Sequence, residues 1–170
     1  MRRGLSLIAA LGAMFLPGAV AAATFDDPAR YCAAVGTIDR PDQRYTGETV
    51  PAWMARALKE AAHAPASAPL AEFSRATWRC AEGQVLACLY GANIPCDEKA
   101  DTRPVPSPGA LRFCERNPAA DVVPAYATGR ATIFEWRCGS GRPVVVRQAL
   151  HPDTQGFARE YWYRITPNGK

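Results

Sequence analysis

The chain has few of the residue types on which catalytic and metal sites are built. Only two histidines, His63 and His151, occur in 170 residues. The sequence contains no Cys-x-x-Cys pair and no Gly-x-Ser-x-Gly motif, which argues against a thiol redox enzyme and a serine hydrolase of the nucleophile-elbow type. Its histidines and cysteines do not occur at zinc-binding spacing. We therefore expect no catalytic residue of these classes, no metal and no other cofactor.

Beyond its first 23 residues the chain also lacks a long apolar run and a cluster of basic residues. The formal net charge is +4. Without Arg2 and Arg3 it falls to +2, because 18 basic residues then face 16 acidic ones. These charges are interspersed, whereas nucleic-acid-binding proteins usually carry a clustered basic face. We expect no nucleic-acid partner and no membrane span in the mature chain.

Residues 1–23 have the pattern of a cleaved secretory signal peptide. Two arginines precede an apolar run over residues 5–16, and small residues follow that run. The alternative is a retained anchor, but the run is only about half the roughly 20 residues that a membrane-spanning helix needs. We expect cleavage near Ala21 or Ala23, and a single mature domain, residues 24–170, that is periplasmic or secreted.

Six cysteines follow this segment: Cys32, Cys80, Cys88, Cys96, Cys114 and Cys138. An even number of cysteines in an exported chain predicts a disulfide framework, because an oxidising compartment keeps the thiols paired. A cysteine nucleophile would need a free thiolate. A catalytic cysteine is therefore not expected, and the cysteines are interpreted as structural.

Local patterns predict one helix and two β-hairpins. A helix is expected over about residues 50–63, where Pro51 fits the first turn and apolar residues recur at helical spacing. Residues 77–90 and 132–148 each predict a hairpin with glycine in the turn. The stretch 26–49 is interpreted as a loop-rich entry to the domain.

Two further segments connect or end these elements. Alternating prolines, Pro104, Pro106 and Pro108, predict a polar extended linker over residues 97–109. Residues 157–165 alternate in side-chain type with a period of two, which predicts a strand at a sheet edge or on a functional surface.

Two parts of the chain resemble each other. Trp78-Arg79-Cys80 and Trp136-Arg137-Cys138 each lead into a glycine turn and an apolar strand, and an aromatic–cysteine pair lies upstream of each. We interpret the mature domain as two related halves, about 24–96 and 110–170, with the predicted helix inserted only in the first. The alternative is a chance similarity, because tryptophan and glycine recur in any chain rich in β-structure.

Equivalent halves should have equivalent disulfides. This reasoning pairs Cys32 with Cys80 and Cys114 with Cys138, and it leaves Cys88 to pair with Cys96, although six cysteines allow fifteen pairings. Cys80 and Cys88 would point to opposite faces of the first hairpin, so they are not expected to pair with each other. The predicted fold class is α+β, with two disulfide-stapled hairpin or meander units and one inserted helix.

Five residues remain as candidates for surface recognition. Tyr90 and Asn93 lie on the short loop that the Cys88–Cys96 bridge would close, and rigid loops often carry binding residues. Arg147, Tyr161 and Trp162 lie near the C-terminus, and these residue types are the usual interface anchors. The alternative is that the tryptophans pack beside disulfides and Asn93 adopts a turn conformation.

These residues favour a non-catalytic binding or inhibitor-like module of the bacterial cell envelope, with an envelope protein or a cell-wall component as partner. The alternative is a small periplasmic hydrolase acting on envelope polymers, in which His151 and Asp153 would supply a base and its orienting carboxylate. The intervening proline favours a turn at that place. A third possibility is a purely structural stress protein.

Three phrases of the sequence resemble small exported bacterial cysteine-containing proteins of unknown function: Trp78-Arg79-Cys80, Gly91-Ala92-Asn93-Ile94-Pro95-Cys96 and Trp136-Arg137-Cys138. This resemblance covers most of the mature chain and implies no activity. Trp-Arg-Cys-x-x-Gly is also similar to the short β-hairpin of periplasmic C-type lysozyme inhibitors. The Ser-rich, Lys-bearing inhibitory loop of that family has no counterpart in this sequence.

Overall fold

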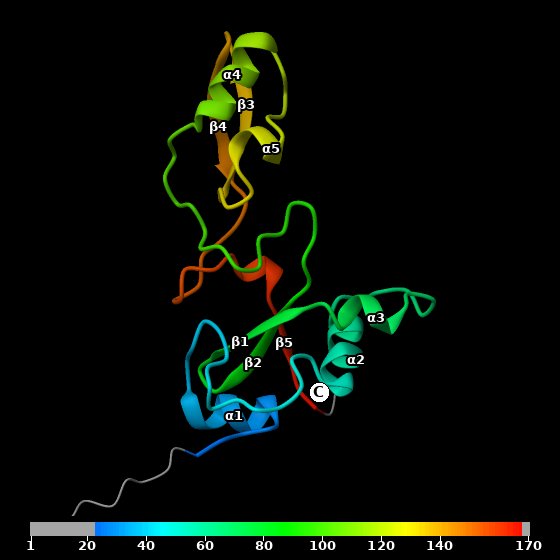
Figure 1. The fold of residues 1–170 in the computed structure, drawn as a ribbon. Helices are drawn as coiled ribbons and strands as arrows, with labels where there is room; N and C mark the ends of the chain where they lie inside the picture. Colours follow the sequence, from blue (N-terminus) through cyan, green and yellow to red (C-terminus); the bar gives the residue numbers. More distant parts are fainter. Residues whose placement is uncertain (1–22, 168–170) are drawn as a thin grey trace, which may run out of the picture.

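A computed structural model describes residues 23–167 of the chain (Figure 1). The predicted signal peptide therefore lies outside the described residues, apart from Ala23. Helices combine with two small antiparallel sheets and three disulfides in an α+β fold. The two sheets belong to two lobes, and each lobe has a hydrophobic core of its own. Within residues 23–167 no helix has the length and apolar character that a membrane crossing requires.

The first lobe is a three-stranded antiparallel sheet packed against helices. Its strands are β1 (Thr77–Ala81), β2 (Gln84–Cys88) and β5 (Tyr163–Ile165), in the order β1-β2-β5. Helix α1 (Pro28–Val35) contacts β1 and β2, α2 (Ala52–Ala61) contacts β5, and α3 (Leu70–Phe73) lies beside α2. The core of this lobe is built around the buried side chains of Tyr31, Met54, Leu58 and Trp78.

The second lobe is smaller and its sheet has only two strands. These are β3 (Phe134–Gly139) and β4 (Arg142–Gln148), and helices α4 (Pro108–Arg116) and α5 (Ala125–Thr128) complete the lobe. Its core contains Trp136 together with the Cys114–Cys138 disulfide. The two predicted hairpins and the predicted helix over about residues 50–63, observed as α2, are therefore confirmed.

Four helices were not expected from the sequence: α1, α3, α4 and α5. Stretch 26–49 contains α1, and the predicted linker 97–109 ends inside α4. Helices α1 and α4 each begin with a capping side chain followed by proline, because Asp27 accepts a hydrogen bond from the Arg30 N–H and Ser107 accepts one from the Ala110 N–H. Helices of this length are marginal in isolation. They form here because caps and tertiary contacts hold them.

The disulfides pair as predicted: Cys32 with Cys80, Cys88 with Cys96, and Cys114 with Cys138. The first and third bridges are equivalent in the two lobes, because each joins a helix to the first strand of a hairpin. The Cα–Cα distances of these two bridges are 5.2 and 5.3 Å. Each lobe is thus a helix stapled across a hairpin.

The backbone contacts around these two bridges are also equivalent. The N–H of Cys80 donates to the Ile38 carbonyl at 3.0 Å, and the N–H of Cys138 donates to the Ala120 carbonyl at 2.7 Å. Both acceptors lie six residues after the helical cysteine. The two hairpin turns match as well, because Glu82-Gly83 and Ser140-Gly141 have positive φ at both positions, the pattern of a type I′ turn.

The end of the chain differs from the prediction. Residues 157–165 do not form one strand, since a 3-10 helix, η1 (Arg159–Tyr161), precedes the short strand β5. Strand β5 belongs to the first lobe, because it pairs with β2 and Ile165 is buried in that lobe's core. The predicted second half, 110–170, is therefore wrong at its C-terminal end.

The separate cores predict that the two lobes lose stability separately. Closing the loop of 24 residues between Cys114 and Cys138 should stabilise the fold by about 3.5 kcal/mol. We expect the double variant Cys114→Ala/Cys138→Ala to lose hydrogen-exchange protection in β3 and β4 and to keep it in β1 and β2. The control variant Cys32→Ala/Cys80→Ala should show the opposite pattern. Loss of protection in both lobes of the first variant would contradict this prediction.

Candidate binding groove and the Arg79 anchor

The chain between β4 and β5 returns across the first sheet. We call residues 151–162 of this connection the C-terminal strap (Figure 1). Its first turn is stabilised by Asp153, whose Oδ1 accepts hydrogen bonds from the backbone N–H groups of Gln155 and Phe157 at 2.9 and 3.0 Å. Pro152 and Ala158 form an antiparallel bridge across this turn. The turn therefore presents Gln155 and Phe157 in fixed positions.

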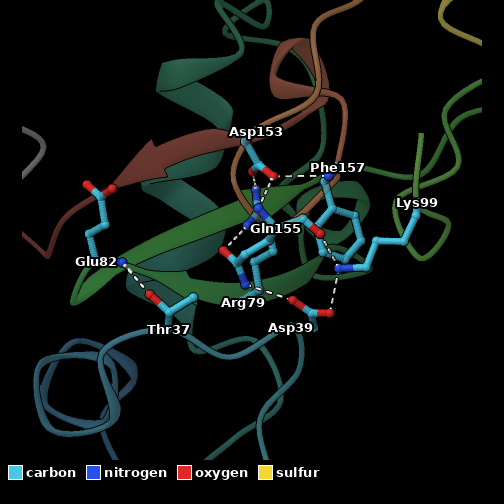
Figure 2. Close-up of polar contacts among 8 residues, drawn as sticks. All are labelled: Thr37, Asp39, Arg79, Glu82, Lys99, Asp153, Gln155 and Phe157. Carbon is cyan, nitrogen blue, oxygen red and sulfur yellow. Dashed lines mark hydrogen bonds and ion pairs between the residues drawn. The ribbon is translucent and has the colours of Figure 1, made fainter. Parts of the chain in front are cut away.

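The strap is held to the first lobe by Arg79 of β1. Neighbouring strand residues alternate in direction, so Trp78 and Cys80 enter the core while Arg79 faces the strap. The Arg79 side chain is 0% exposed, and its guanidinium binds the Asp153 carboxylate and the Gln155 side-chain oxygen (Figure 2). The guanidinium carbon also lies 4.6 Å from the ring centre of Phe157 and 4.4 Å from that of Trp162.

A second ion pair lies at the edge of this cluster. Lys99 binds the Asp39 carboxylate and the Gln155 backbone oxygen, and its Nζ lies 3.8 Å from the ring centre of Phe157 (Figure 2). The hydrogen bond from Lys99 holds the pKa of Asp39 below its usual value, although partial burial opposes this effect. Asp39 therefore stays ionised at neutral pH and keeps Lys99 on the strap.

The Arg79 cluster anchors the strap to the first lobe. Two of its guanidinium nitrogens are occupied by strap side chains, and aromatic rings lie over the group. A pocket of about 450 Å³ beside the cluster is lined by Arg79, Asp153 and Trp162. The sequence analysis did not select Arg79. The repeated Trp-Arg-Cys phrase would have indicated Arg79. Side chains alternate between the two faces of a strand, so the arginine lies on the face opposite the core when the tryptophan and the cysteine enter it.

Two of the five predicted binding residues meet in one groove. The groove has a volume of about 450 Å³ and lies where the second lobe meets the strap and the loop after β2. Asn93 of that loop and Tyr161 of η1 line it together with apolar residues of the second lobe, among them Val122, Phe134, Val146 and Leu150. Burial raises the pKa of Tyr161, and nearby Glu160 raises it further, so the hydroxyl stays neutral.

The other three predicted residues lie elsewhere. Arg147 is exposed and forms an ion pair with Glu135, which itself lines the groove. Tyr90 is 48% exposed and is not among the residues that line the groove. Trp162 packs on Arg79 and on the Phe157 ring, so it is part of the anchor.

The histidine of the alternative hydrolase hypothesis has a different partner. His151 Nδ1 lies 2.9 Å from Glu160 Oε1, whereas Asp153 is committed to Arg79. Burial alone would raise the pKa of Glu160, but hydrogen bonds from the His151 backbone and ring lower it overall. His151 is exposed and does not line the groove. Within residues 23–167 no three His, Cys, Asp or Glu side chains are grouped so as to hold a metal ion.

The two Trp-Arg-Cys arginines allow a matched test of the anchor. Removing one partner of a buried ion pair costs about 3–5 kcal/mol, whereas changes at exposed positions usually stay within about 0.5 kcal/mol. We expect Arg79→Met to lower the free energy of unfolding by about 3 kcal/mol and to expose strap amides to hydrogen exchange. Arg137→Met, at an exposed position, should have little effect on either. Equal effects of the two variants would show that strap contacts do not anchor the fold.

Comparison with known proteins adds no family to this description. No family model matches the chain, and no curated protein or solved structure is significantly similar to it.

Proposed function

We propose that this chain is an exported, non-catalytic binding module of the bacterial cell envelope and that the groove between its lobes receives the ligand. The observation that carries the proposal is the convergence of Asn93 and Tyr161 with apolar side chains of the second lobe around one groove. Ligand sites typically combine an apolar lining with a few placed polar groups, and they often lie between domains. The three disulfides support an oxidising compartment.

The apolar lining of the groove supports recognition of a ligand with apolar surface of its own. Val122 is 69% exposed and Val146 is 51% exposed, and exposed aliphatic side chains beside a tyrosine are typical of a recognition surface. Asp121, Glu135 and Arg130 contribute charges to the same lining. This mixture suits an envelope protein segment or a cell-wall component, and an inhibitor-like role follows if the bound partner is an enzyme.

The groove is tested by capture of ligands on the immobilised, oxidised mature chain. Periplasmic extract and solubilised cell-wall material are passed over the wild type, Tyr161→Ala and Val146→Asp. The ligand retained by the wild type should bind each groove variant at least about tenfold more weakly, the loss expected when an interface anchor is truncated.

The matched control is Tyr126→Ala, which removes a tyrosine that is 81% exposed and lies outside the groove lining. This variant should retain the ligand as the wild type does. Hydrogen exchange on each variant checks that the strap and both hairpins remain protected. Failure of the wild type to retain a ligand, or equal retention by the groove variants, would contradict the proposed function.

A further inference from the structure

The outer face of the second sheet repeats the face that carries the Arg79 anchor. Arg79 lies opposite Leu86 in the first hairpin, and Arg137 lies opposite Val144 in the second. Both arginines stand between the tryptophan and the cysteine that enter the core of their lobe. Alternation along the strand therefore turns Arg137 away from the core, as it does Arg79.

The surroundings of the two arginines are nevertheless different. Arg79 is fully buried beneath the strap, whereas Arg137 is exposed. The side chain of Arg137 forms no hydrogen bond or ion pair with any residue from 23 to 167. A Cβ atom placed on Gly139 would lie 3.5 Å from Nη1 of Arg137 and 3.2 Å from a methyl carbon of Val144. The guanidinium thus rests along the bare face beside Val144.

This face combines an unpaired charge with exposed apolar surface. Val144 is 38% exposed, so it contributes apolar area next to the guanidinium. In the first lobe the same arrangement is covered by a carboxylate, that of Asp153, and by the aromatic ring of Phe157. The chain's own strap is already bound at Arg79, which leaves the second face to another molecule.

We propose that the outer face of the β3–β4 sheet, formed by Arg137, Gly139 and Val144, binds a segment of a partner protein. That segment carries a carboxylate and, four residues later, an aromatic ring, as Asp153 and Phe157 do in the strap. The carboxylate pairs with the Arg137 guanidinium, and the ring packs on the guanidinium and on Val144. Charged pairing with a stacked ring is a recurrent use of arginine at interfaces.

The partner segment is recognised by its side chains rather than as an added strand. In the first lobe β5 pairs with β2 at Val85. The corresponding position in the second lobe is Pro143, which lies opposite Cys138 as Val85 lies opposite Cys80. Proline offers no N–H to a further strand. A carboxylate and an aromatic ring are therefore the features that the face selects.

The test uses a synthetic peptide with the sequence of residues 151–162 as the probe and the intact oxidised chain as the receptor. NMR titration should shift the amide signals of Arg137, Gly139 and Val144. Arg137→Met should weaken peptide binding at least about tenfold, as truncation of an anchor does. The matched variant Arg112→Met changes an exposed arginine of α4, the helix that the Cys114–Cys138 bridge joins to the opposite, core-facing side of the sheet, and should bind the peptide as the wild type does.

The peptide provides its own controls. A peptide in which the positions of Asp153 and Phe157 hold Asn and Ala should not bind. Tyr161→Ala in the receptor should leave peptide binding unchanged, because Arg137 and Val144 do not line the groove. A failure of peptide binding at this face therefore does not bear on ligand binding in the groove, and the reverse also holds.

Three results would overturn the proposal. The first is no binding at about 1 mM peptide, a concentration that detects even very weak complexes. The second is binding that Arg137→Met does not weaken, or shifts confined to the first lobe, which would indicate exchange with the chain's own strap. The third is a dimer in sedimentation analysis that Arg137→Met abolishes, which would assign the face to a second copy of the chain.

Discussion

The burial of one guanidinium, that of Arg79, is the interaction on which the arrangement of this chain depends. A buried charge is unfavourable unless it is paired and hydrogen-bonded, and the partners of Arg79 all come from the strap. The strap must therefore lie across the first sheet. This path of the chain places β5 beside the free edge of β2 and buries Ile165 in the core of the first lobe. One charged side chain thus decides where a distant segment of the chain ends.

The two lobes show how one scaffold can serve two purposes. Each has a helix joined by a disulfide to a hairpin with a type I′ turn, and each has its own core. Because the staple and the turn maintain the scaffold, the outer face of the sheet is free to vary. In the first lobe that face holds the strap, whereas in the second lobe it remains exposed at Arg137 and Val144.

The groove illustrates the limit of reasoning from residue types. Tyrosine, tryptophan and arginine near the C-terminus indicated recognition, and Tyr161 does line a groove with Asn93. Trp162 is the next residue, yet it packs on Arg79 within the anchor. Residue type and spacing predict that such side chains lie at a surface or interface. They do not distinguish a contact within the chain from one with a ligand, because the two use the same chemistry.

The sequence by itself determined the features that depend on local geometry and on the alternation of side chains between the two faces of a strand. The hairpins follow from alternation and from glycine in the turns, and the disulfide pairs follow from the repeated Trp-Arg-Cys phrase. The tertiary structure alone decided that α1 and α4 form, that Arg79 is buried while Arg137 is exposed, and that β5 joins the first sheet. These outcomes depend on contacts between residues far apart in the chain, such as Arg79 with Asp153, whose energies no local pattern contains.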